Sequence, residues 1–206
     1  MIETNNASGC QATNSVVITV DALPTVTLGI TTGQMCSNET FTISTPTGPA
    51  NGVDYQWSAT GGGTFNNNAA LNPNFTPSAT NINDGSVDIT FKYTKRGICN
   101  DTQVTVGTFT IDIQESPTAN AGIDQSICGD STANLNGTVG AGAGSTLWEI
   151  IGAGTGTISA PSSLNAVYTP SQADIDAGQV TLRLTANPVS PCANPAVDEM
   201  TIKISN

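Results

Sequence analysis

The sequence predicts an all-β protein made of two tandem β-sandwich domains in a linear array. Three observations support this prediction: a composition rich in turn formers, an internal repeat of roughly 90 residues, and stretches in which apolar and polar side chains alternate. The 206 residues include 21 glycines and 11 prolines, and only 10% are charged. That profile suits short strands joined by many turns and argues against helical bundles.

The repeat is anchored by two segments of similar sequence. FTPSATNINDG at 75–85 and YTPSQADIDAG at 168–178 align without a gap and share threonine, proline, serine, isoleucine and glycine. Other landmarks recur 91 to 93 residues apart, which predicts two domains of one family. These landmarks are Pro24 and Pro117, the early cysteines Cys36 and Cys128, Trp57 and Trp148, Phe75 and Tyr168, and the late cysteines Cys99 and Cys192.

The repeat places the domain boundaries. Repeat 1 is expected at 23–115 and repeat 2 at 116–206, after a segment at 1–22 that contains Cys10 and the strand-like run SVVITV. The segment 1–22 resembles the tails that follow the two late cysteines. We interpret it as the last strand of a truncated preceding repeat, with the partner of Cys10 lying upstream. The alternative is an ordinary free thiol near a terminus.

Alternation within each repeat predicts antiparallel strands. Apolar and polar side chains alternate over 87–93 and again over 180–185, as in strands that bury one face. Segments 78–84 and 171–177 are the only short helical turns expected, each opened by a capping serine and closed by a glycine. The short, proline-bearing joint at 114–117 predicts a semi-rigid row of domains.

The cysteine spacing predicts one disulfide in each domain. Early and late cysteines are separated by 63 residues in repeat 1 and 64 in repeat 2, which favours the pairs Cys36–Cys99 and Cys128–Cys192. The absence of a CxxC pair argues against zinc. Disulfides would imply export to an oxidising compartment, whereas the alternative is buried thiols in a reducing cell.

The tryptophans are expected in the domain cores. Trp57 and Trp148 follow the early cysteines by 21 and 20 residues. In immunoglobulin-like (Ig-like) sandwiches a central-strand tryptophan packs on a disulfide between the sheets. We therefore expect Trp57, Trp148, Phe75 and Tyr168 to be core residues; the alternative for the tryptophans is sugar stacking.

Charge excludes several classes of partner. Five basic residues against 16 acidic ones give a net charge of −11, which would repel phosphate backbones and anionic lipid. The sequence contains no apolar run of about 18 residues or more, so no membrane insertion is expected. The predicted partners are neighbouring repeats and, as a candidate, surface polysaccharide or another extracellular ligand.

Three aspartates make calcium a candidate ligand, although no cofactor is required. Asp174 and Asp176 form a DxD turn, and Asp124 is a further hard oxygen donor in the same repeat. Repeat 1 carries Asn81 and Asn83 at the DxD positions. Turn stabilisation by these side chains is the alternative explanation.

Catalysis is not expected. The chain has no histidine, which removes Ser–His, Cys–His and histidine–metal arrangements. No pair of carboxylates recurs in both repeats, as glycoside hydrolysis in each would need. We therefore predict that the protein is not an enzyme.

Repeat 2 resembles the Ig-like or PKD-like repeats of giant Bacteroidota surface proteins, including the mobile adhesins of gliding motility. The resemblance rests on AGIDQSIC at 121–128, Trp148 followed by GAGTGTI, YTPSQADIDAGQVTLRLT at 168–185, and Cys192 followed by DEMTIKI. Repeat 1 departs from the pattern at LGITTGQMC, which lacks the counterpart of Asp124.

The resemblance implies an extracellular, cell-surface location and export by the type IX secretion system. It also implies a non-catalytic, disulfide-locked stalk segment of a long adhesin that serves surface attachment or gliding. Two alternatives stay open: a carbohydrate- or protein-binding β-sandwich module, and accessory domains of a secreted polysaccharide-degrading enzyme.

Overall fold

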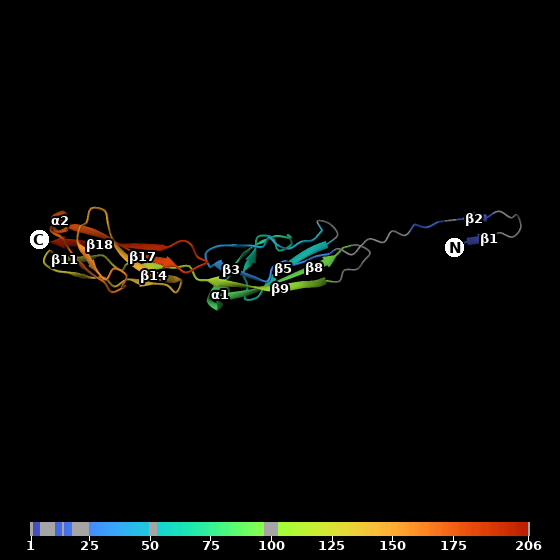
Figure 1. Ribbon diagram of the computed structural model, residues 1–206, viewed down its shortest axis with the longest axis horizontal. Helices are drawn as coiled ribbons and strands as arrows, with labels where there is room; N and C mark the ends of the chain where they lie inside the picture. The colour runs from blue at the N-terminus through green and yellow to red at the C-terminus, as the bar shows by residue number, and fades with distance from the viewer. Residues whose placement is uncertain are drawn as a thin grey trace.

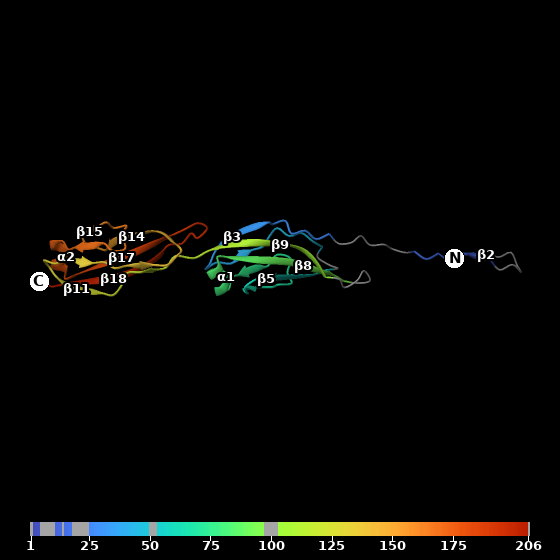
Figure 2. The same ribbon diagram turned by 90° about the horizontal axis from the view of Figure 1, so that it is seen from below.

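The fold is all-β, as the sequence predicts. The computed structural model describes residues 2–4, 11–13, 15–17, 25–49, 53–96 and 103–205. Strands dominate this part of the chain and only two helices, each of six residues, occur in it. The strands build two β-sandwiches that lie end to end (Figures 1 and 2).

Repeat 1 is a sandwich of a four-stranded and a three-stranded sheet. The larger sheet has the order β3-β9-β8-β5 and the smaller one β4-β7-β6. A single bridge between Thr27 and Thr47 supplements them. The elements are β3 (Thr32–Cys36), β4 (Phe41–Thr42), β5 (Val53–Ala59), β6 (Thr64–Phe65), β7 (Asn74–Thr76), α1 (Ala79–Asp84), β8 (Ser86–Lys95) and β9 (Gln103–Gln114).

Repeat 2 has the same arrangement. Its larger sheet has the order β11-β18-β17-β14 and its smaller one β12-β16-β15, and the pair β10-β13 takes the place of the Thr27–Thr47 bridge. The elements are β10 (Ala119–Asn120), β11 (Gln125–Cys128), β12 (Ala133–Asn134), β13 (Thr138–Val139), β14 (Ala143–Ile151), β15 (Thr157–Ser159), β16 (Val167–Thr169), α2 (Gln172–Ala177), β17 (Gln179–Pro188) and β18 (Ala196–Ser205).

One feature of the larger sheets decides where the early cysteines lie. β3 runs parallel to β9, the last strand of repeat 1, and β11 runs parallel to β18, the last strand of repeat 2. All other strand pairs in the described ranges are antiparallel. Each early cysteine ends its strand beside the end of the last strand, so it lies at the C-terminal end of its own sandwich.

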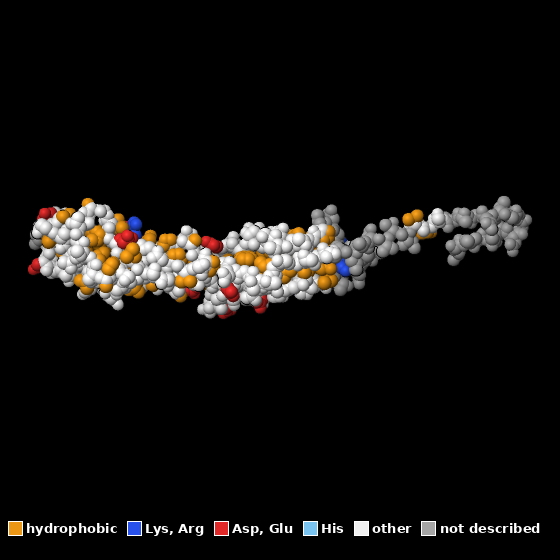
Figure 3. All heavy atoms as spheres, viewed as in Figure 1, with side chains coloured by type: hydrophobic (Ala, Val, Ile, Leu, Met, Phe, Trp, Pro, Cys, Tyr) orange, Lys and Arg blue, Asp and Glu red, His pale blue; other side chains and the backbone are white. Residues whose placement is uncertain are grey.

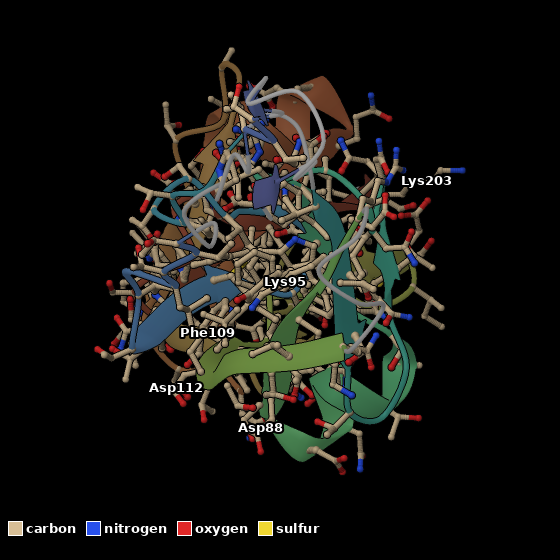
Figure 4. All side chains as sticks on the ribbon, turned by 90° about the vertical axis from the view of Figure 1, so that its right-hand side faces the viewer. Asp88, Lys95, Phe109, Asp112 and Lys203 are labelled. Carbon is tan, nitrogen blue, oxygen red and sulfur yellow. A yellow bond between two sulfur atoms is a disulfide. The ribbon has the colours of Figure 1, made fainter. Side chains whose placement is uncertain are left out.

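Each sandwich has its own hydrophobic core between its two layers. Phe109 on β9 is 2% exposed and points into the core of repeat 1, whereas Asp88 and Asp112 project from the opposite face of the same sheet (Figure 4). Such inward and outward alternation is what an antiparallel sheet with one solvated face requires.

The two short helices match the expected turns. Ser78 caps α1 and Ser171 caps α2, each through a reciprocal capping box with the third residue of the helix. Gly85 and Gly178 close the helices with φ of 71° and 74°, a left-handed conformation that glycine adopts without strain. The prediction of a helical turn at both places is confirmed.

The N-terminal segment contains a small hairpin in which β1 (Ile2–Thr4) pairs with β2 (Gln11–Thr13). Of the strand-like run that follows, Ser15–Val17 is described; it is not in a strand, and all three residues are exposed. The rest of the run and Cys10 lie outside the described residues. The interpretation of 1–22 as the last strand of a preceding repeat therefore stays a prediction.

Candidate functional site

A disulfide joins the two repeats. Cys36 of repeat 1 is bonded to Cys192 of repeat 2, across 156 positions of sequence and with their Cα atoms 4.8 Å apart. The bond lies where the two sandwiches meet, and we call this region the junction. Its residues come from β3, the end of β9, the joint after β9 and two loops of repeat 2.

The parallel pairing of β3 and β9 brings Cys36 to the junction. Cys36 is in register with Gln114, the last residue of β9. Because both strands run toward repeat 2, Cys36 reaches the boundary at the same point as the chain itself. The side chain is 2% exposed, since repeat 2 covers this end of the sandwich.

The loop between β17 and β18 brings Cys192 to the same place. The Cys192 amide donates to the Val189 carbonyl at 3.0 Å, which closes a turn in this loop. The Cys192 sulfur lies 3.5 Å from the carbonyl oxygens of Gln114 and Glu115. A bonded sulfur has no proton to donate, so these are packing contacts between the bridge and the joint.

Polar contacts fasten the joint itself. The Ser37 amide donates to the Gln114 carbonyl at 2.8 Å, and the Ser116 amide donates to the Ser37 hydroxyl at 2.9 Å. The Ser37 hydroxyl in turn donates to the Ser116 hydroxyl at 3.3 Å. Pro117, next along the chain, is buried. The joint is therefore held by both repeats and does not act as a free linker.

Gly142, before β14, allows the loop of repeat 2 to approach the joint. A Cβ atom at Gly142 would lie 2.1 Å from the Glu115 carbonyl oxygen, far inside contact distance. The Val189 amide donates to the Gly142 carbonyl at 3.3 Å, which ties this loop to the one that carries Cys192. No motif in the sequence marks Gly142, Ser37 or Ser116, because the spacing of landmarks does not show which residues meet across a boundary.

The predicted pairing within each repeat is wrong for the described cysteines. Cys36 is bonded to Cys192 and not to Cys99; Cys99 itself lies outside the described residues. Cys128, the predicted partner of Cys192, is an exposed free thiol.

Strand length explains the correction. Cys128 is in register with Ser205, the last residue of β18, whereas Cys192 precedes the first residue of β18, Ala196. The ten residues of β18, at ~3.3 Å each, separate the two ends by about 30 Å. A disulfide requires Cα atoms within about 7 Å, so an early and a late cysteine of one repeat lie too far apart.

The predicted core residues are buried. Trp57 and Trp148 are each 2% exposed, and Phe75 and Tyr168 are fully buried. Trp57 stacks on Phe91 with ring centroids 4.1 Å apart. The tryptophans do not pack on a disulfide between the sheets of one domain, because the bridge lies at the junction instead.

Asp174 is a buried carboxylate at the start of α2, 1% exposed. Its oxygens accept hydrogen bonds from the Tyr168 hydroxyl at 2.7 Å, from the Ser171 amide at 3.0 Å and hydroxyl at 2.9 Å, and from the Thr155 amide at 3.0 Å. In repeat 1 the buried Asn81 takes this place: it accepts from the Ser78 amide and donates to the Thr60 carbonyl.

These contacts shift the ionisation of both partners. Burial raises the pKa of Asp174, but the hydrogen bonds from Ser171, Tyr168 and Thr155 together outweigh it and lower the pKa to about 2. Burial, and then the neighbouring carboxylate, raise the pKa of Tyr168 well above its usual range. Asp174 is thus a charged structural group that holds α2 to the end of β16.

The three calcium candidates do not come together. The Asp124 carboxylate accepts from the Thr201 amide at 2.8 Å, and that of Asp176 accepts from Gln172 at 2.8 Å on the outside of α2. Asp174 has its oxygens occupied by the donors named above. Within the described ranges, no group of three or more acidic or cysteine side chains is placed to hold a metal ion.

The described surface carries no exposed aromatic side chain and, on the face in Figure 3, no single apolar patch. All ten aromatic residues lie in the described ranges, and none is exposed. Apolar atoms are scattered over the face in Figure 3 rather than gathered in one patch. Neither described helix is long or apolar enough to cross a membrane. The junction is therefore the best-defined candidate functional site.

Comparison with known proteins shows the fold. No family model and no curated protein sequence matches the chain. Two crystal forms of human protocadherin-24 EC1-2 are similar in structure, each with a TM-score of 0.50 over 90% of this chain, at 11% and 8% identity, and are covered to 98% and 100%. The D00–D0 domain of intimin aligns over 87% of this chain and 99% of its own, at 15% identity with a TM-score of 0.43. The two protocadherin structures, at a TM-score of 0.50, support the fold alone: two Ig-like β-sandwiches in tandem.

Proposed function

We propose that this chain is a load-bearing stalk segment of a long extracellular adhesin. The observation that carries the proposal is the Cys36–Cys192 bridge across the junction. A disulfide inside one domain would stabilise that domain alone, whereas this one fixes the connection between two domains. The slender end-to-end arrangement and the absence of exposed aromatic side chains among the described residues favour a spacer over a ligand-binding module.

The bridge changes the route that tension takes through the chain. Force that enters repeat 1 along 25–36 crosses the disulfide and leaves along 192–205. The 156 positions spanned by the bridge carry no tension in this route. Extended at ~3.3 Å per residue, they would add about 500 Å of length. The bridge therefore stops the stalk from lengthening even when its sandwiches are strained.

Single-molecule stretching tests this mechanism. The oxidised chain, held at its two ends, is compared with the double variant Cys36→Ser, Cys192→Ser. We expect the double variant to extend about 500 Å further at full unfolding. Cys128→Ser is the matched control and should behave as the unmodified chain. Equal extensions of the oxidised chain and the double variant would contradict the proposed mechanism.

We further propose a cell-surface role in attachment or gliding motility, in a type IX-secreted protein of the Bacteroidota kind. The resemblance of repeat 2 to repeats of such adhesins supports this narrower role, with neighbouring repeats as the first partners and surface polysaccharide as a candidate ligand. An antibody against this chain, applied to intact cells, is the test. Labelled spots that travel along gliding cells are expected; a lack of surface or secreted labelling would refute the extracellular role.

A further inference from the structure

We infer that Cys128 is the bonding site for the late cysteine of another repeat of this kind, docked on repeat 2 as repeat 2 is docked on repeat 1. The docking surface is the distal end of repeat 2, formed by the C-terminal ends of β11 and β18. The inference rests on the proposed stalk function, since it extends the same bridge to the next junction.

The backbone around Cys128 already has the geometry found around Cys36. Cys36 is in register with Gln114, and Cys128 is in register with Ser205, both in parallel pairs. The residue after each cysteine donates its amide to that partner's carbonyl: Ser37 to Gln114 at 2.8 Å and Gly129 to Ser205 at 2.9 Å. The Cys36 and Cys128 carbonyls each accept a second turn hydrogen bond, at 3.1 and 3.0 Å.

The two equivalent cysteines differ in exposure and in bonding. Cys36 is 2% exposed and bonded, because repeat 2 supplies Cys192 and covers it. Cys128 has the same place in its sandwich but is exposed and free. Cys36 thus indicates the partner that Cys128 would take: a late cysteine from the loop between the last two strands of the next repeat.

The side chains of the distal end make the bridge more important there. At the junction Ser37 binds Ser116 through its hydroxyl, but Gly129 replaces Ser37 in repeat 2 and has no side chain to offer. A further repeat would therefore have fewer polar contacts to hold it. The disulfide would be the main fixed point between repeat 2 and its neighbour.

Formation of the bond is an oxidation. The Cys128 thiol and the incoming thiol lose two protons and two electrons, and the new S–S bond forms by exchange with a disulfide oxidant, which takes up those protons and electrons and is cleaved to two thiols. Oxidised glutathione supplies that oxidant in the test below. An exposed thiol is open to this exchange, unlike the covered sulfur of Cys36.

A lengthened chain provides the test. Residues 116–206 are placed a second time directly after Asn206. Because Gln114 corresponds to Ser205 in the strand registers, Asn206 takes the place of Glu115, and the natural spacing of the joint is restored. The folded, oxidised chain is treated with an alkylating reagent and mapped without reduction by mass spectrometry. The matched control carries Cys128→Ser.

We expect a peptide that joins Cys128 to Cys192 of the appended copy, and a free thiol at the appended Cys192 in the control. Cys128 should be alkylated in the original chain, where it is free and exposed, and protected from alkylation in the lengthened chain. Full alkylation of Cys128 beside an intact Cys36–Cys192 bond would overturn the inference and leave the proposed function standing. A bond from Cys128 to the Cys192 of its own repeat would overturn both.

Discussion

At the residue scale, the two repeats use different chemistry at one buried position. Tyr168 donates to the carboxylate of Asp174 in repeat 2, whereas repeat 1 has Phe75 and Asn81 at the same places, both buried. The hydroxyl and the charge occur together and are replaced together within one chain. This suggests that they form a unit, since a buried carboxylate needs several donors to offset its desolvation.

Tyr168→Phe should therefore destabilise repeat 2 by about 1.5–3 kcal/mol, the range for a hydrogen bond to a charged group. In an Asp174→Asn background the same change should cost less, because an uncharged acceptor binds the hydroxyl more weakly. Urea unfolding, followed by the NMR signal of the Trp148 indole, reports on repeat 2.

Tyr55→Phe is the matched control in repeat 1: its hydroxyl donates to the neutral Pro49 carbonyl, so a loss of about 1 kcal/mol is expected. If the losses of unfolding free energy for Tyr168→Phe and Asp174→Asn were additive, the hydroxyl and the carboxylate would not be coupled, and the explanation would be wrong.

Asp174 should also make repeat 2 sensitive to acid. The pKa of its carboxyl is about 2 in the folded chain and about 3.9 when unfolded. Because the folded value is the lower one, the stabilisation is fully present above the unfolded pKa and is lost as the pH falls through the folded one. About 2.5 kcal/mol should disappear between about pH 5 and pH 1.

Unfolding of repeat 2 by urea at a series of pH values checks this dependence. Asn81 has no proton to gain in this range, so repeat 1 should lack this contribution. Asp174→Asn should remove it from repeat 2. An unchanged pH profile in that variant would show that other carboxylates cause the acid sensitivity.

At the element scale, the helical turns and strands were predictable because local signals determine them. Ser78 and Ser171 cap the helices, and glycines with positive φ end them, where the sequence indicated. Alternation over 87–93 and 180–185 gave the face that each strand buries. Local sequence could not give the parallel pairing of β3 with β9, because that contact joins strands about 80 residues apart.

Gly85 and Gly178 allow a direct test of the helix ends. Apart from the two chain neighbours, no atom of the described residues comes closer than 3.9 Å to a Cβ added at either glycine, so alanine there meets no steric clash with them. The cost of Gly178→Ala or Gly85→Ala should be conformational, about 1 kcal/mol in the affected repeat. Asparagine tolerates the left-handed conformation better and should cost less. Urea unfolding of each repeat measures both, and equal losses for alanine and asparagine would refute the explanation.

At the scale of the whole molecule, the predicted disulfide pairing failed for a physical reason. In a repeat array, early and late cysteines keep the same spacing whether each early cysteine bonds within its own repeat or to the next one. Spacing alone cannot separate these patterns. What decides is that the last strand, ten or twelve residues long, places the two cysteines at opposite ends of a sandwich.

A bridge between repeats should stabilise both repeats, whereas a bridge within one repeat should stabilise that repeat alone. The bridge restricts the conformations of either repeat when that repeat unfolds and its neighbour stays folded. Removing the bridge with Cys36→Ser gives the unfolded repeat more conformational entropy, so it should destabilise both repeats. A loop of about 80 residues corresponds to about 4.5 kcal/mol in the chain-entropy model. Cys192→Ser should have the same effect on both, and Cys128→Ser should have almost none.

The indole NMR signals of Trp57 and Trp148 follow the two repeats separately during urea unfolding. Bridges confined to single repeats would give the opposite pattern, in which Cys36→Ser affects only Trp57 and Cys192→Ser affects only Trp148. Reduction of the unmodified chain should lower the stability of both repeats together.

If every junction is bridged as this one is, the disulfides overlap along the array and limit its length. From a late cysteine to the next early cysteine, as from Cys99 to Cys128, is 29 residues, or about 95 Å when extended. For every two repeats, tension therefore passes through one disulfide and then through the 29 residues that lead from its late cysteine to the next early cysteine. The last strands of two repeats, with 12 and 10 residues, already account for about 70 Å of folded length. The array then has almost no slack.

Two copies of 23–206 joined end to end give a four-repeat chain that tests this limit, since Leu23 corresponds to Ser116 at the start of a repeat. Stretched in its oxidised form, the chain should gain little length beyond its two terminal segments. With every early cysteine replaced by serine, it should gain about 300 Å for each repeat of some 90 residues, less the folded length. A gain of that size in the oxidised chain would show that the bridges do not overlap, and the stalk would then resist force only through the stability of its separate sandwiches.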